Sequence, residues 1–191
     1  MKVLLTAVNA KYIHSNLAVY DLRAYAEAYG TGGAQVEIGE YTINHTIDYI
    51  LEGIYKAKPD VLCFSCYIWN LDYVEQLMDE YHKICPEVPI WVGGPEVSYE
   101  TEAFLKEHPQ VTGVMVGEGE ETFLELCESY AKAGIGEMAE KMNLSGIKGI
   151  MYRAGESLVK TGAREPLDLN RIPFCYGGVE DFRNRIIYYE S

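Results

Sequence analysis

The sequence predicts an α/β domain with a doubly wound, five-stranded parallel sheet, and three observations lead to this prediction. Short apolar runs with strand character alternate with longer runs of helical periodicity, an order that indicates β-α-β units. The run at residues 61–66 is apolar throughout, as expected for a central strand covered on both faces. The run at residues 89–96 ends in two glycines, at the carboxyl end of a predicted strand, where open parallel sheets place their ligands.

The elements follow in a regular order as far as residue 133. The predicted strands lie at residues 2–8, 35–41, 61–66, 90–92 and 111–116. The predicted helices lie at residues 17–29, 46–56, 70–85, 98–107 and 120–133. The second strand is short and alternating, which indicates a sheet edge, and Ser15 or Asn16 is a plausible cap for the first helix. Because crossovers between parallel strands are right-handed, a flavodoxin-like or Rossmann-like arrangement is expected.

The chain is predicted to have three parts. Residues 1–134 form the α/β domain, and residues 135–175 form a hairpin and a linker. The hairpin is expected at residues 149–162, around the turn signal Ala-Gly-Glu-Ser, and Pro166 and Pro173 indicate extended backbone after it. Residues 176–191 end on a strand-like run that stops in mid-pattern, so we expect them to begin a further domain.

Composition excludes several classes of partner. The 191-residue chain has a formal net charge of −13 and a pI of about 4.7, which disfavours binding to nucleic acid. No apolar run reaches the length of about 18 residues that a membrane span needs. The five cysteines are scattered and odd in number, so reduced thiols in a cytoplasmic protein are expected.

Metal-binding and redox motifs are weak in this chain. Cys63 and Cys66 have a Cys-x-x-Cys spacing, but they lie in or at the end of an apolar strand, which favours buried structural cysteines. The four histidines show no ligand spacing, so no metal site is predicted. Glu118, Glu120 and Glu121 imitate an acid–base cluster, although carboxylates at the start of a helix are commonly there for its positive end. No catalytic residue is assigned.

The candidate site is the set of loops that follow the first, third, fourth and fifth predicted strands. In a parallel sheet these loops share one edge, and together they present aromatic rings, small polar groups and bare backbone. Such an edge suits a large flat ligand better than an isolated phosphate. The candidate ligand-binding residues are Asn9, Tyr12, His14, Ser15, Ser65, Cys66, Tyr67, Trp69, Gly93, Gly94, Pro95, Glu96, Gly117, Glu118, Gly119 and Glu120.

Four motifs in these loops resemble the N-terminal cobalamin-binding domain of radical S-adenosylmethionine (SAM) enzymes. They are Asn9-Ala10-Lys11-Tyr12-Ile13-His14-Ser15, Cys63-Phe64-Ser65-Cys66-Tyr67-Ile68-Trp69-Asn70, Gly93-Gly94-Pro95-Glu96-Val97-Ser98 and Gly117-Glu118-Gly119-Glu120-Glu121-Thr122-Phe123. Each motif is loose alone, but four in this order are fairly specific. The resemblance covers nearly the whole chain. The family that it indicates includes methyltransferases and relatives of an anaerobic porphyrin-ring cyclase.

The resemblance implies roles for the candidate residues. Ser65, Gly93 and Gly94 would line the pocket for the nucleotide tail of cobalamin. The groups expected to approach the corrin ring are Tyr67, Trp69, Pro95 and Glu96. Gly117 and Gly119 would allow close backbone approach, and Glu118 or Glu120 would accept hydrogen bonds from corrin amides. The SAM site and the 4Fe-4S cluster would belong to a C-terminal radical SAM domain in cis, which this chain lacks.

One departure from other cobalamin domains leaves alternatives open. The Asp-x-His-x-x-Gly motif, whose histidine binds cobalt, is absent, because Tyr12 and Leu17 occupy its flanking positions around His14. A domain of the same fold without cobalamin, acting as a scaffold or a substrate-recognition element, is therefore the second hypothesis. The third is a stand-alone binder of flavin or nucleotide, against which the missing glycine-rich loop after the first strand argues.

Overall fold

The computed structural model describes residues 1–12, 14–133, 144–176 and 186 of the chain. Its strands are β1 (Lys2–Asn9), β2 (Gln35–Thr42), β3 (Val61–Ser65), β4 (Ile90–Gly93), β5 (Gly113–Met115), β6 (Ile150–Ala154) and β7 (Ser157–Lys160). Its α-helices are α1 (Leu17–Tyr29), α2 (Ile47–Ala57), α3 (Leu71–Ile84), α4 (Pro95–Ser98), α5 (Thr101–Glu107) and α6 (Glu120–Ala133). Short 3₁₀ turns lie at Leu144–Gly146 and Leu169–Arg171.

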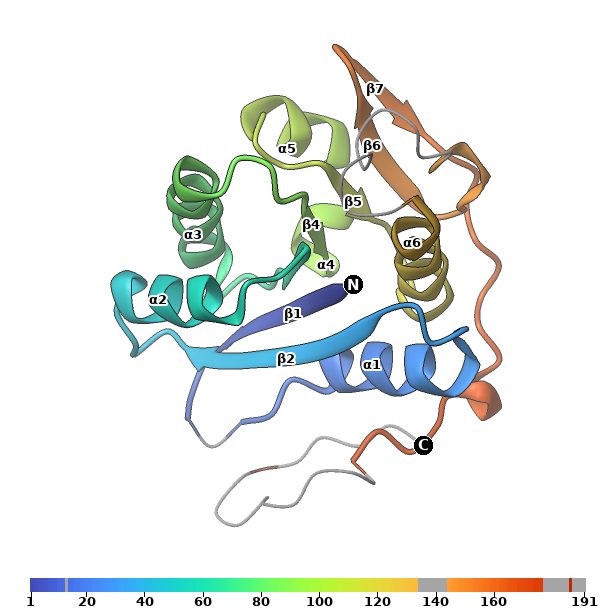
Figure 1. Cartoon of the computed structure of the whole chain (residues 1–191), viewed down its shortest axis with the longest axis horizontal. Helices are drawn as coiled ribbons and strands as arrows, with labels where there is room; N and C mark the ends of the chain where they lie inside the picture. The colour runs from blue at the N-terminus through green and yellow to red at the C-terminus, as the bar shows by residue number, and fades with distance from the viewer. Residues whose placement is uncertain (13, 134–143, 177–185, 187–191) are drawn as a thin grey trace.

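The strands form a single sheet in the order β2-β1-β3-β4-β5-β6-β7 (Figure 1). The first five strands in that order are parallel, so the predicted doubly wound parallel sheet is confirmed. The predicted edge position of β2 is also confirmed. The chain winds one way through β2 and the other way through β3, β4 and β5, which places the topological switch point between β1 and β3.

The strand count differs from the prediction because the C-terminal hairpin joins the sheet. β6 pairs antiparallel with β5, and β7 pairs antiparallel with β6. The hairpin at residues 149–162 is as predicted, but its sequence pattern does not say which strand it pairs with. Without it, β5 would leave a row of unpaired backbone groups at the sheet edge, so the hairpin closes an exposed edge.

Helices cover both faces of the sheet (Figure 1). We call the side covered by α2, α3 and α5 the packed face, where Leu4 and Phe64 of the strands meet Leu77 of α3 in one buried cluster. We call the side covered by α1 and α6 the cavity face, where Leu5 and Cys63 belong to a second cluster. Because successive residues of a strand point to opposite faces, neighbouring residues of β1 and β3 serve different clusters.

The predicted helix at residues 98–107 is wrong in its bounds. Two helices occupy this part of the chain, and α4 begins at Pro95, directly after the glycine pair. Proline suits the first position of a helix, since its fixed φ is helical and its missing N–H needs no partner there. Pro95, a candidate ligand-binding residue, therefore begins a helix at the edge of the candidate site.

The caps of α1 and α2 differ. Thr46 caps α2 in the usual way, because its hydroxyl accepts a hydrogen bond from the backbone N–H of Tyr49 at 3.3 Å. Asn16 stands at the N-cap position of α1, but its side chain makes no capping hydrogen bond. Asn16 therefore occupies the predicted N-cap position, but its side chain does not cap the helix and makes a different contact.

The segment after the hairpin is tied to α6 and α1 (Figure 1). Nη1 of Arg164 lies 3.0 Å from Oε2 of Glu121, and Nη1 of Arg171 lies 2.8 Å from Oε1 of the same carboxylate. The hydroxyl of Tyr29 donates to the backbone oxygen of Arg171 at 2.9 Å. Residues 134–143, most of which belong to the predicted hairpin and linker region, and most of the predicted strand-like run at residues 185–191 lie outside the described residues. The three-part division stays a prediction.

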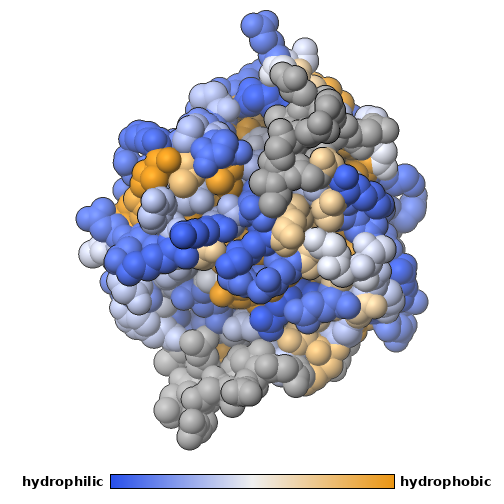
Figure 2. All heavy atoms as spheres, viewed as in Figure 1, coloured by the Kyte–Doolittle hydropathy of each residue, from blue (hydrophilic) through white to orange (hydrophobic). Residues whose placement is uncertain are grey.

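The surface in the view of Figure 1 is mostly hydrophilic, with hydrophobic residues in small patches (Figure 2). This distribution agrees with the net charge of −13. Within the described ranges, no helix is long and apolar enough to cross a membrane.

Candidate functional site

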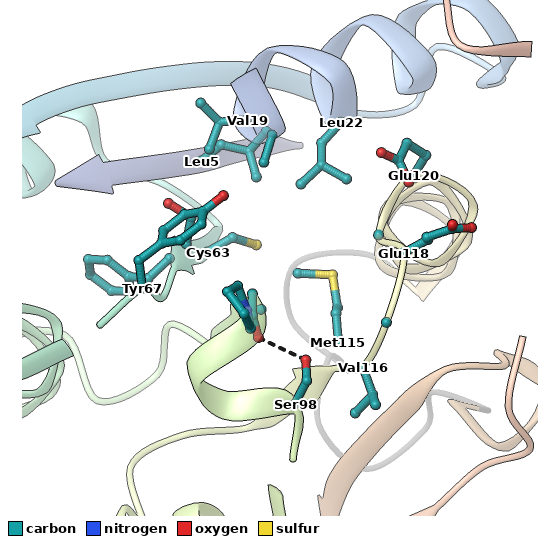
Figure 3. A pocket seen from close by; sticks show the side chains of 18 of the residues that line it. Leu5, Val19, Leu22, Cys63, Tyr67, Ser98, Met115, Val116, Glu118 and Glu120 are labelled. Atoms are coloured by element: carbon teal, nitrogen blue, oxygen red, sulfur yellow. Dashed lines mark hydrogen bonds between the residues drawn. The ribbon is translucent and has the colours of Figure 1, made fainter. Parts of the chain in front are cut away.

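A cavity of about 610 Å³ lies on the cavity face at the carboxyl ends of the central strands. Residues from β1, α1 and β3 line one part of it, and residues at the ends of β4 and β5 and in the segments after them line the rest (Figure 3). The lining residues are Leu5, Ala18, Val19, Leu22, Cys63, Phe64, Ser65, Tyr67, Gly93, Gly94, Pro95, Ser98, Tyr99, Met115, Val116, Gly117, Glu118, Gly119 and Glu120. A cavity of this size at a switch point is suited to a group as large as a nucleotide.

Asn70 holds the loop after β3. Its side-chain amide donates to the backbone oxygens of Val8 at 3.0 Å and Ser65 at 2.9 Å. Its carboxamide oxygen accepts from the backbone N–H of Tyr67 at 2.8 Å. One fully buried side chain therefore joins the ends of two neighbouring strands and fixes the turn that carries Ser65 and Tyr67.

Gly94 is required where the loops after β3 and β4 touch. Its φ of +115° is one that L side chains rarely adopt, and a Cβ there would lie 2.4 Å from the backbone oxygen of Cys66. Beside it, the N–H of Cys66 donates to the oxygen of Gly93 at 2.7 Å. A Cβ at Gly93 would meet only ordinary contacts with Met115 at 3.5 Å. Gly94 is therefore needed for the backbone conformation of the loop, whereas Gly93 leaves space in the cavity wall.

The loop between β5 and α6 forms the far side of the cavity. Gly117 has a φ of +84°, and a Cβ at Gly119 would lie 3.0 Å from Cδ2 of Leu22. Burial, followed by the nearby carboxylates of Asp21 and Glu118, raises the pKa of Glu120. The exposed carboxylate of Glu118 accepts a hydrogen bond from the backbone N–H of Leu167, so the C-terminal segment is attached directly to the rim of the cavity.

A polar network around Glu40 of β2 holds the start of α1. Oε1 of Glu40 accepts from Nδ2 of Asn9 and from the backbone N–H of Asn16, each at 3.1 Å. Oε2 of Glu40 accepts from the hydroxyl of Tyr20 at 2.6 Å. Asn16 in turn donates through Nδ2 to Oγ of Ser65 at 3.1 Å, which links this network to the cavity wall.

The structure brings only part of the predicted set into the cavity. The predicted residues that line it are Ser65, Tyr67, Gly93, Gly94, Pro95, Gly117, Glu118, Gly119 and Glu120. The predicted residues that do not line it are Asn9, Tyr12, His14, Ser15, Cys66, Trp69 and Glu96. Their roles in binding a cofactor stay predictions.

The residues outside the cavity have other contacts. Tyr12 packs edge-on against the ring of His45, with centroids 5.1 Å apart. The ring of Trp69 stacks on Tyr67 at 4.5 Å, so it borders a side chain of the cavity without lining it. Ser15 Oγ and the hydroxyl of Tyr176 share a hydrogen bond of 3.2 Å, which connects the loop after β1 with the C-terminal segment.

The cysteines at the third strand are buried. Burial raises the pKa of the Cys63 and Cys66 thiols, so both are uncharged at neutral pH. The side chain of Cys63 lies against the cavity (Figure 3), whereas Cys66 belongs to the cluster of the packed face. The expectation of buried cysteines in this motif agrees with the structure.

The sequence reasoning missed the inner wall of the cavity. Leu5, Val19, Cys63 and Met115 were assigned to strands and helix, and their apolar character predicts core just as well as a binding wall. A usable signal was the small size of Ala18, Cys63 and Gly93, which face the same space from three elements.

A doubly wound α/β fold with a large cavity at its switch point defines a cofactor-binding domain. The model of the B12 binding domain family matches residues 3–127, and the chain belongs to that family. The predicted resemblance to cobalamin-binding domains is thereby confirmed, and cobalamin is the cofactor of this module.

The similar proteins are longer enzymes. The chain is 28% identical over 139 residues to the cobalamin-dependent radical SAM methyltransferase TokK of Streptomyces tokunonensis, a match that covers 72% of this chain and 19% of TokK. It is 25% identical over 162 residues to the anaerobic magnesium-protoporphyrin IX monomethyl ester cyclase of Rubrivivax gelatinosus, covering 82% of this chain and 28% of the cyclase.

A solved structure shows the same fold. The cobalamin-dependent SAM radical enzyme OxsB, with aqua-cobalamin and SAM bound, superimposes with a TM-score of 0.71 at 20% identity. The match covers 90% of this chain and 23% of that one. The chain therefore spans less than a third of the length of each of these proteins.

Proposed function

We propose that this chain holds cobalamin by its nucleotide tail, with the corrin ring across the carboxyl edge of the sheet and facing a radical SAM domain in cis. The observation that carries the proposal is the cavity at the switch point, within the region matched by the B12 binding domain model. When bound, cobalamin supplies a cobalt centre that can carry a methyl group. The reaction of the whole protein is then methyl transfer or related radical chemistry, as the names of TokK and the cyclase suggest.

The residues present fit such a group. The cavity wall is largely apolar, which suits the flat base at the end of the tail, and a Cβ at Gly94 would displace the loop that frames it. The carboxamide oxygen of Asn16 is buried beside Ser65 with no donor among the described residues, so an unpaired acceptor lies behind the wall. Buried polar atoms without a partner are uncommon in native structures, and a group bound nearby is one explanation for this oxygen.

The residues of this chain bind and orient the cofactor. Ser65, Gly93 and Gly94 would hold the tail, and Tyr67 with its stacked partner Trp69 would support the corrin from the loop after β3. Glu118 and Glu120 would accept hydrogen bonds from amide groups of the corrin, which are donors. The apolar inner wall excludes water from the base. The protein supplies binding, orientation and electrostatics, and the cobalt chemistry belongs to the cofactor.

The test is a titration of the purified chain with hydroxocobalamin, followed by desalting and a visible spectrum. The matched variants are Ala18→Phe, which fills the cavity from α1, and Ala28→Phe, which adds the same ring to an exposed position of the same helix. We expect Ala18→Phe to weaken binding by about 100-fold and Ala28→Phe to leave it unchanged.

Two outcomes would count against the proposal. Binding by Ala18→Phe equal to that of the parent chain would place the cofactor elsewhere. No binding by the parent chain at about 100 µM cobalamin, an affinity weaker than about −5.5 kcal/mol, would show that this chain does not hold the cofactor alone.

A further inference from the structure

The cavity has two chemically different ends. Leu5, Val19, Cys63 and Met115 are each at most 4% exposed and still line it, so they form a deep apolar wall. Their only side-chain heteroatoms are the Met115 thioether sulfur, a weak acceptor, and the Cys63 thiol, which burial keeps uncharged. The carboxylates of Glu118 and Glu120 lie on the α6 side, away from Cys63 and Tyr67 (Figure 3). A flat group pressed against the deep wall therefore loses water and gains few polar partners.

Ser65 is the hydrogen-bonding side chain at the β3 border of this wall. It lies two residues after Cys63 on β3, pairs in register with Gly93, and lines the cavity. Its hydroxyl oxygen accepts from Nδ2 of Asn16 at 3.1 Å. Because the oxygen accepts from Asn16, its hydrogen is directed to another acceptor, and the cavity supplies the space for one.

Asn16 is held in place independently of Ser65. Its backbone N–H donates to Glu40, the same carboxylate that binds Asn9 and Tyr20. The residue is 7% exposed, and its side chain makes no capping hydrogen bond to α1. The Asn16 amide is thus aimed across to β3, where it sets the direction of the Ser65 hydroxyl.

We propose that this cavity selects a corrinoid whose tail ends in an alkylated benzimidazole over one that ends in a purine, and that Asn16 is the positioning residue for this choice. The inference rests on the proposed function. A benzimidazole released from cobalt presents one ring-nitrogen acceptor, which the Ser65 hydroxyl satisfies, and apolar edges that fit the deep wall. The amino group and extra ring nitrogens of a purine would be buried against Leu5, Val19 and Met115 without partners.

The first experiment compares three corrinoids on the full chain. Dissociation constants are measured for hydroxocobalamin, for the adenine-bearing analogue pseudocobalamin and for tail-less cobinamide. We expect cobalamin to bind about 10- to 100-fold more tightly than pseudocobalamin, since unpaired polar groups in apolar sites cost about this much discrimination.

The outcomes separate this inference from the proposed function. Equal affinities for cobalamin and pseudocobalamin would overturn the selectivity and leave cobalamin binding intact. If pseudocobalamin binds as tightly as cobalamin, and Glu120→Gln lowers the affinity for pseudocobalamin but not for cobalamin, the purine binds on the α6 side of the cavity. The proposal is then wrong. If none of the three binds, the proposed function itself fails.

The second experiment tests Asn16 through Ser65. Ser65→Ala removes the donor, and we expect it to lower the affinity for cobalamin about 5- to 30-fold with little change for cobinamide. Asn16→Asp keeps a good N-cap residue but replaces the amide donor with an acceptor for the Ser65 hydroxyl, so the same loss is expected.

The ratio of the cobalamin and cobinamide affinities is the readout, because a merely structural defect would move both. The double variant Ser65→Ala/Asn16→Asp should lose no more of this ratio than Ser65→Ala alone. Parent-like ratios for Asn16→Asp would show that the hydroxyl does not depend on Asn16. If Asn16→Asp does not fold, Ser65→Ala with an unchanged ratio still overturns the proposal.

Discussion

The two faces of the sheet are built from the same strands, yet the cavity at the carboxyl ends of the central strands lies on one of them. On the packed face, Leu4 and Phe64 meet Ile50, Leu77 and Met78, all of them nearly inaccessible. On the cavity face, Leu5 and Cys63 point toward α1, whose nearest residues include Ala18 and Val19. The difference in side-chain size leaves about 610 Å³ on that side.

This contrast separates stability from binding within one domain. Close packing on the packed face contributes to the stability of the fold, because large apolar side chains gain the most from leaving water. Small residues on the other face give up part of that burial and leave a wall for a ligand. A truncation on the packed face should therefore lower mainly the free energy of unfolding. A truncation on the cavity face should weaken mainly the binding of cobalamin.

The largest expected difference is between Leu77→Ala and Leu22→Ala. Leu77 is fully buried on the packed face, so its truncation should lower the free energy of unfolding by about 2–5 kcal/mol. Leu22 already borders the cavity, and its truncation should cost about 1 kcal/mol. Urea unfolding measures both. Cobalamin titration should rank them in reverse, with Leu22→Ala the weaker binder, and equal destabilisation would remove the distinction between the faces.

The glycine pair offers an intermediate effect. Gly94→Ala should lower the free energy of unfolding by about 1–3 kcal/mol and weaken cobalamin binding, because its Cβ meets the Cys66 oxygen and its φ is positive. Gly93→Ala should leave the free energy of unfolding within about 0.5 kcal/mol, since its Cβ meets only ordinary contacts with Met115. Urea unfolding and cobalamin titration check both variants. Similar losses for both would show that the loop does not depend on Gly94 backbone geometry.

Much of the fold could be predicted because its information is local. Strand and helix periods, and glycines after strands, are visible in single segments, and they placed Ser65, Gly94 and Glu120 at one edge. The pairing of the hairpin with β5 could not be predicted, because a hairpin pattern does not name its neighbour. The inner wall was missed for a related reason: a buried Leu5 has the same sequence pattern whether a helix or a ligand covers it.

Asn16 shows most clearly what a local sequence pattern cannot predict. An asparagine before an apolar helix predicts a cap, and the position is right. Its side chain instead reaches Ser65, which lies 49 residues away in sequence, and no local pattern records that contact. Tyr12 and His14 were predicted to bind the ligand because they lie in the loop after the first strand, but neither residue lines the cavity.

The smallest expected effect is the pH dependence that Glu120 adds to the cavity face. Burial raises the pKa of this carboxyl above its ordinary value of 4.5, so the folded chain binds more protons than the unfolded chain between those two values. The free energy of unfolding should therefore fall as the pH rises through this window. Glu120→Gln removes that loss, so at about pH 7 the variant should be more stable than the parent.

Urea unfolding of both proteins between about pH 4 and pH 7 measures this difference. At the lower pH the parent carboxyl is protonated and resembles the glutamine, so the two free energies should converge. A Glu120→Gln variant that is less stable at neutral pH would mean that the helix start needs the negative charge more than burial opposes it.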